Sequence, residues 1–156
     1  MPDATIEAAR NILGDSLGEL RAAIDPCSAE QLNRRPGGDD TNGLAVLSTH
    51  ALQSTRSWLS LATGAELPHR DRPAEFQVVV DDADAFMSWF DATAQECRAL
   101  LDAAGPFDPS RVGTAPWRPD DLAHEPVTAA WALMHALAHL REHVGHTQLT
   151  RQVAGG

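Results

Sequence analysis

Hydrophobic residues recur at intervals of three and four positions in four long segments of the chain. This spacing is typical of helices that bury one face. In the first segment Asp3 is expected to cap the helix and Asp25-Pro26 to end it, and its apolar face consists of Ile6, Ala9, Leu13, Leu17, Leu20 and Ile24. The second helix is expected over residues 44–62, and Gly64 closes it because glycine readily adopts the left-handed conformation found after helices.

The third and fourth segments follow the same pattern. Asp81, with Asp84 three residues later, is expected to cap the third helix, and Gly105-Pro106 to end it. The apolar face of this helix consists of Phe86, Phe90, Thr93, Cys97, Leu100 and Leu101. Pro126 is expected as the first residue of the fourth helix, which continues to about Val153, because proline is favoured at the first helical position.

The connections between these helices show little regular structure. Ser28 and Gln31 are spaced as in a capping box, which predicts one short helical turn. Residues 76–80, FQVVV, favour a strand, but one apolar run without a partner cannot build a sheet, so we expect an extended linker. Residues 106–125 contain four prolines and no periodicity. Trp117 within them either packs as a lid over a pocket or fills the end of the helical assembly.

Four amphipathic helices without a credible sheet predict an all-α protein, a four-helix bundle. A chain of 156 residues fits one domain, here residues 1–156. In such a bundle a metal site can be assembled from side chains on facing helices.

Composition narrows the range of functions. The net charge is −10, from 22 acidic and 12 basic residues, and such a surface repels nucleic acids. No apolar run approaches the length of a membrane span, and the N-terminus lacks the pattern of a signal peptide, so we expect a cytoplasmic protein. Cys27 and Cys97 lie far apart in the sequence, and we expect both to be reduced thiols, as cysteines usually are in the cytoplasm.

Four of the seven histidines lie between Trp131 and Arg151. They are His135, His139, His143 and His146. Since each residue of an α-helix turns by about 100°, all four fall within an arc of about 80° on one face of the helix. Two imidazoles four residues apart on a helix can bind one metal ion, and both His135/His139 and His139/His143 have that spacing. Core histidines satisfied by hydrogen bonds are the alternative. A helix supplies two ligands to such a site, so a third must come from another element.

His50 is the best candidate for this third ligand. On a helical wheel it lies within the apolar face of residues 44–62, among Leu47, Ser54, Trp58 and Leu61. The alternative is a buried neutral histidine that bonds a carbonyl group. Trp58, two turns further along, is expected in the core or in the wall of a pocket.

Two segments carry a family resemblance: TNGLAVLSTHALQSTRSWLSLATG and HALAHLREHVGHTQLTRQVAGG. They resemble the DinB/YfiT-like metalloenzymes, which include the mycothiol-dependent maleylpyruvate isomerase and related thiol transferases. The resemblance implies a four-helix bundle, often dimeric, with a divalent metal held by His50, His139 and His143. His135 is then a neighbouring pocket residue. In the commonest family pattern glutamine follows Gly145, whereas here His146 does.

The resemblance also implies a function. We expect a metal-dependent S-transferase or isomerase that uses a low-molecular-weight thiol such as mycothiol or bacillithiol and acts on a small-molecule substrate. Zinc or nickel is the expected metal, and a homodimer the expected assembly. A metal-dependent hydrolase and a non-catalytic dimeric metal-binding module are the alternatives. Glu142 either orients an imidazole or relays a proton, or is a solvated charge. Candidate pocket residues are Trp58, Trp117, His135 and His146.

Overall fold

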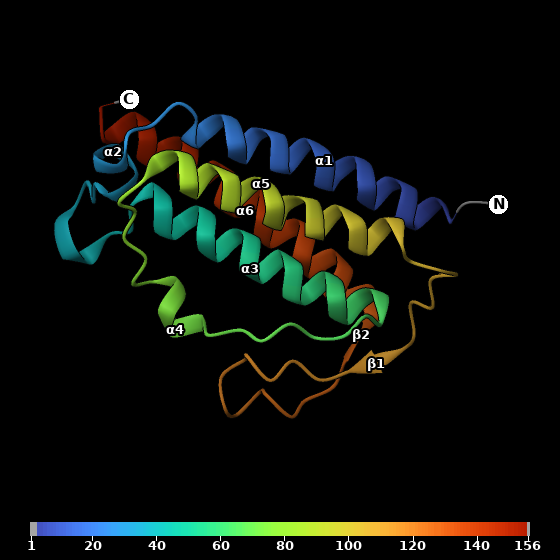
Figure 1. Cartoon of the computed structure of the whole chain (residues 1–156). Helices are drawn as coiled ribbons and strands as arrows, with labels where there is room; N and C mark the ends of the chain where they lie inside the picture. The colour runs from blue at the N-terminus through green and yellow to red at the C-terminus, as the bar shows by residue number, and fades with distance from the viewer. Residues whose placement is uncertain (1–2, 156) are drawn as a thin grey trace.

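The computed structural model describes residues 3–155. Four long helices pack side by side into a bundle, and Figure 1 shows the last of them behind the others. They are α1 (Ala4–Ile24), α3 (Leu44–Thr63), α5 (Ala83–Asp102) and α6 (Ala129–Val153). The expected all-α four-helix bundle is therefore confirmed.

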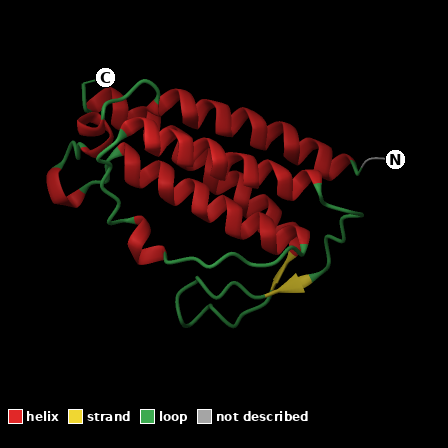
Figure 2. Cartoon of the chain, viewed as in Figure 1, coloured by secondary structure: helices red, strands yellow, loops and turns green. Residues whose placement is uncertain are grey.

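Short elements join the long helices (Figure 2). Between α1 and α3 lie the one-turn helix α2 (Ala29–Asn33) and a 3-10 turn, η1 (Gly38–Asp40). The connection from α3 to α5 contains α4 (Arg72–Glu75). The connection from α5 to α6 contains β1 (Val112–Gly113), which pairs antiparallel with β2 (Val127–Thr128).

Helix α3 is buried on nearly all sides because it packs against α6 on one side and α5 on the other. Several of its buried hydroxyl groups donate hydrogen bonds to carbonyl oxygens one turn earlier in the same helix, as Ser48 does to Leu44 at 2.7 Å and Thr55 to Ala51 at 2.7 Å, whereas the Thr49 hydroxyl has no partner within residues 3–155. A polar side chain can be buried at low cost when its hydrogen bond is made locally. The apolar core around α3 includes Leu13, Leu20, Leu52, Leu59, Phe90, Leu101, Leu133 and Leu140.

Two predicted helix starts differ from the structure. Helix α5 is capped by Asp82, whose side chain accepts a hydrogen bond from the Ala85 amide at 3.0 Å, and not by Asp81. Helix α6 begins at Ala129 behind the cap Thr128, not at Pro126. The physical reason is the β1–β2 pairing, which holds residues 127 and 128 extended and so delays the helix.

Other expectations for the connections are largely met. Residues 76–80 take part in no strand pairing, as expected of a linker, although Phe76 and Gln77 form a turn after α4 and are not extended. Ser28 and Gln31 form the expected capping box of α2. The one-turn helix α4 and the β1–β2 ladder were not expected. Within residues 3–155, none of the helices combines the length and the apolar character that crossing a lipid bilayer requires.

Candidate metal centre

Three histidines meet where α3 faces α6. His50 projects from α3, and His139 and His143 lie one turn apart on α6. Each offers a ring nitrogen, and these nitrogens lie within 4.8 Å of one another. We call His50, His139 and His143 the histidine cluster.

The spacing within the histidine cluster suits a small divalent ion. The Nε2 atoms of His139 and His143 are 3.3 Å apart. Four ligands placed tetrahedrally around zinc at about 2.0–2.1 Å are separated from one another by about 3.3–3.4 Å. The ring of His50 approaches both others, with centroid distances of 5.1 Å to His139 and 4.9 Å to His143. The His139–His143 spacing therefore fits two positions of a tetrahedral metal site, and His50 lies close enough to supply a third.

The two histidines of the cluster that lie on α6, His139 and His143, are neutral at physiological pH. Burial, together with the neighbouring imidazoles, lowers the pKa of His139 to about 3. Burial and the His50 ring lower the pKa of His143 to about 4. Neutral imidazole is the form that binds metal ions. The environment of the cluster thus holds these side chains in the form that a ligand requires.

Behind His50 lies a carboxylate that the sequence pattern did not indicate. The Nδ1 atom of His50 is 2.7 Å from Oε2 of Glu75, and both side chains are buried. Arg70 donates two hydrogen bonds to the same carboxylate, at 2.7 Å and 3.1 Å. Burial raises the pKa of Glu75, but the bonds from His50 and Arg70 outweigh it and lower the pKa overall, so the carboxylate is ionised.

Aromatic side chains surround His135, which lies one turn before His139 on α6. The Trp58 ring contacts those of Trp117, Trp131 and His135, with centroid distances of 5.3 Å, 5.3 Å and 4.8 Å. His135 stacks on Trp131 and lies 5.5 Å from the ring of His139. We call Trp58, Trp117, Trp131 and His135 the aromatic cluster. The long loop thus places Trp117 against Trp58, and Trp131 is a further member of this cluster that the sequence did not indicate.

The other candidates lie further out. His146 is exposed, with its ring 5.8 Å from that of His143. Glu142 lies on the exposed side of α6, and within residues 3–155 it makes no hydrogen bond to an imidazole. His69 and His124 are exposed loop residues. The carboxylate that contacts the cluster comes instead from α4.

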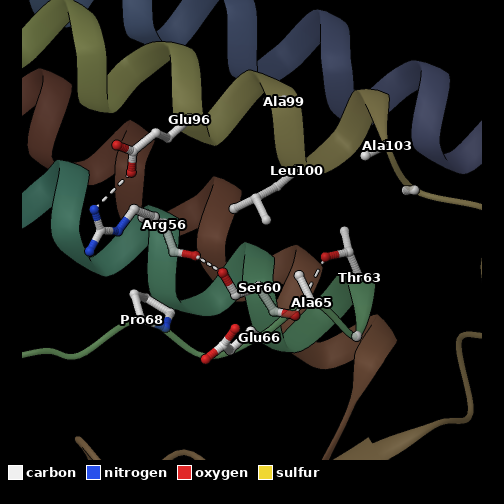
Figure 3. A pocket seen from close by; sticks show the side chains of 12 residues that line it. Arg56, Ser60, Thr63, Ala65, Glu66, Pro68, Glu96, Ala99, Leu100 and Ala103 are labelled. Atoms are coloured by element: carbon white, nitrogen blue, oxygen red, sulfur yellow. Dashed lines mark hydrogen bonds and ion pairs between the residues drawn. The ribbon is translucent and has the colours of Figure 1, made fainter.

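Three cavities help to locate where a ligand can enter. One of about 610 Å³ lies between residues 69–73 and 116–120 and is lined in part by Arg70, Trp117 and Arg118. A second, of about 580 Å³, lies between α3 and α5, where Arg56 pairs with Glu96 (Figure 3). None of the cluster histidines lines either cavity, but the first is lined by Arg70, whose guanidinium bonds Glu75 behind His50. A third cavity, of about 340 Å³, is lined by both Arg70 and Glu75.

Comparison with known proteins identifies the family. The sequence profile of the DinB superfamily matches residues 13–147. The crystal structure of a conserved protein from Enterococcus faecalis is similar, with a TM-score of 0.73 and 15% identity over 99% of this chain and 98% of that chain. At this identity the likeness shows a shared fold alone. A comparison with curated proteins gives no match. Since the profile spans most of the sequence, the chain belongs to the DinB superfamily.

Proposed function

We propose that this protein binds a divalent metal through His50, His139 and His143 and is an enzyme that uses a low-molecular-weight thiol, as an S-transferase or isomerase. The observation that carries the proposal is the convergence of three imidazole nitrogens from two facing helices to within 4.8 Å. Three protein ligands leave a coordination position open, as in catalytic rather than closed structural zinc sites. Zinc or nickel suits three imidazoles.

The chemistry follows from the open position. When bound, a divalent ion lowers the pKa of a thiol or water that it coordinates, so that the deprotonated nucleophile is present at neutral pH. Thiol use is supported by the resemblance of the two histidine segments to the thiol-transferase branch of the family. The neutral rings of His139 and His143 add no charge of their own to the site.

Residues beside the site can shape a substrate pocket. Trp58, Trp117 and His135 form an aromatic wall, in which His135 lies one turn before His139 on α6. Arg70 lies 5.9 Å from the Trp117 ring and also lines the adjoining cavity. We expect the wall to exclude water from the open position and the cavity to admit the small molecule.

Metal binding is tested on protein purified without a histidine tag. We expect about one zinc or nickel ion per chain in elemental analysis and titration calorimetry. His50→Ala should weaken binding by more than about 100-fold, because losing a ligand exceeds the 10–100-fold effect typical of an outer-shell partner. The control is His124→Ala, which removes an exposed loop histidine that lines none of the three cavities and should leave metal affinity unchanged. Equal affinity in wild type and His50→Ala would refute the assigned site.

The reaction is tested by turnover of electrophiles with a panel of small thiols, using metal-loaded and metal-stripped protein. Metal-dependent formation of a thioether or of an isomerised product is the expected result. Metal-dependent hydrolysis that needs no thiol would replace the transferase with a hydrolase. Binding of metal without any metal-dependent rate would favour a non-catalytic module, and light scattering would then show whether it is a dimer.

A further inference from the structure

The connection between α3 and α5 brings two charged, buried side chains against His50. Arg70 and Glu75 are each only 4% exposed at the side chain, although they come from a loop and a one-turn helix. Burying a charged pair is expensive, and it is tolerated when the geometry is good and the remaining hydrogen-bonding sites are filled. Hydrogen bonds and contacts at this position must therefore offset the cost of burying the pair.

Both oxygens of the Glu75 carboxylate are engaged in such hydrogen bonds. Oε1 accepts from Nε of Arg70, and Oε2 accepts from Nη2 of Arg70 and from Nδ1 of His50. Because both carboxylate oxygens already accept hydrogen bonds from Arg70, Glu75 is the acceptor toward His50, and Nδ1 of His50 is the donor that carries the proton. In neutral imidazole the other nitrogen, Nε2, then carries the lone pair that can bind a metal ion.

The remaining two cluster histidines have no such partner. Within residues 3–155 the Nδ1 atoms of His139 and His143 are buried without a hydrogen bond. These two rings are brought together by their four-residue spacing on α6. His50 has no second histidine on α3, so its orientation depends on contacts from outside the helix.

The connection itself is anchored so that it can provide these contacts. The ring of Phe76, next to Glu75, lies 4.8 Å from that of His50. Further along, the Asn33 side chain donates to the Val80 carbonyl at 2.7 Å and accepts from the Val80 amide at 2.8 Å. The segment is thus tied to His50 at one point and to α2 at another.

We propose that Glu75 and Arg70 are positioning residues that select the Nδ1-protonated tautomer of His50 and direct its Nε2 atom toward the point shared with His139 and His143. The inference rests on the proposed metal centre. Glu75 acts directly on the imidazole and increases its basicity as a ligand. Arg70 acts through Glu75, because the guanidinium keeps the buried carboxylate ionised and oriented.

The test measures metal affinity and tautomer, not activity. In Glu75→Gln we expect zinc to bind 10–100-fold more weakly, in competition with a chelator of known affinity. In nitrogen-15 histidine spectra of metal-free wild-type protein, His50 should be protonated at Nδ1, and Glu75→Gln should weaken this preference. The matched control is Glu96→Gln, which changes an Arg–Glu pair between α3 and α5 whose carboxylate is exposed and lies away from the histidine cluster, and which should leave both readouts unchanged (Figure 3).

A double variant separates positioning from simple stabilisation of the loop. Glu75→Gln alone leaves the Arg70 charge buried without its partner, which can destabilise the fold. Arg70→Met with Glu75→Gln removes both charges and should recover thermal stability. If the pair positions His50, weak zinc binding persists in the double variant. If the pair only holds the loop in place, zinc affinity returns to the wild-type value and the proposal is wrong.

The results also distinguish this inference from the proposed function. If wild-type protein binds no divalent metal, the metal centre itself fails. If wild type binds zinc and Glu75→Gln binds it equally well, only the positioning role fails. Where neither variant folds, the wild-type spectrum decides, since a His50 protonated at Nε2 would overturn the proposal.

Discussion

Burial determines the chemistry of the titratable side chains at the scale of single residues. His139 and His143 lose their charge because the site is desolvated and because each imidazole lies beside others. Cys97 shows the same effect in a thiol: it is fully buried in the core, and burial raises its pKa to about 12. Cys27 is half-buried, and its pKa is raised for the same reason.

This burial predicts that the protein loses stability in alkaline solution. The sequence has no lysine and no tyrosine, so thiols are the side chains that titrate between pH 9 and 12. In the unfolded chain Cys97 ionises near 9.0, and in the folded chain only near 12. Above pH 9 the unfolded state therefore binds fewer protons, and the free energy of unfolding should fall by up to about 1.4 kcal/mol per pH unit.

Urea unfolding between pH 8 and pH 11 measures this slope. Cys97→Ala removes the buried thiol and should make the curve flatter, whatever its effect on stability at pH 8. Cys27→Ser is the comparison, because Cys27 is only half-buried and should contribute less. An equal slope in wild type and Cys97→Ala would contradict the assignment.

At the scale of elements, helix starts depend on which polar side chain reaches the free amides. For α1 the sequence offers one clear cap, Asp3, and the structure uses it, with Asp3 accepting from Thr5 at 2.8 Å. For α5 two adjacent aspartates compete, and the structure uses Asp82. For α6 the cap moves to Thr128 because the preceding residues pair with β1.

The competition at α5 provides a matched pair of variants. Asp82→Ala should lower the free energy of unfolding by about 1 kcal/mol, because the Ala85 amide loses its acceptor. Asp81→Ala lies outside the cap and should change stability by less than about 0.5 kcal/mol. Chemical denaturation followed by circular dichroism measures both. A larger loss for Asp81→Ala would place the cap one residue earlier.

At the scale of the whole molecule, the bundle has its own core and does not depend on the histidine cluster for its fold. Large apolar side chains from all four long helices are fully buried, among them Leu13, Leu59, Phe90 and Leu133. Small proteins that need a metal to fold lack such a core. A metal ion at the cluster would therefore be bound by a preformed site.

Metal removal tests this view. After treatment with a chelator, the protein should keep its helical circular dichroism and a cooperative thermal transition. Adding zinc at about 100 times its dissociation constant should stabilise the fold by about 2.7 kcal/mol, since only the native state holds the ligands together. His50→Ala should show almost no such gain. Loss of helicity on chelation would mean that the metal has a structural role.

Much of the bundle could be predicted from the sequence because helix periodicity is local. The apolar face of α1, its cap and its end were all predicted, as were the capping box of α2 and the end of α3 at Gly64. The same periodicity places His139 and His143 on one side of α6. The apolar face of residues 44–62 indicated His50 as the third ligand, the family resemblance selected His139 and His143 as its partners, and the structure brings the three rings together.

The sequence by itself determined the four helices, their buried faces and the histidines that those faces carry, since each depends on residues within a few turns of one another. Only the tertiary structure decided that Glu75 and Arg70 lie behind His50 and that Trp117 and Trp131 meet at Trp58. Apart from that of Trp131, which lies in the first turn of α6, these contacts join a loop or a single turn to a distant helix. Such segments have no periodicity, so their positions follow from the packing of the whole chain.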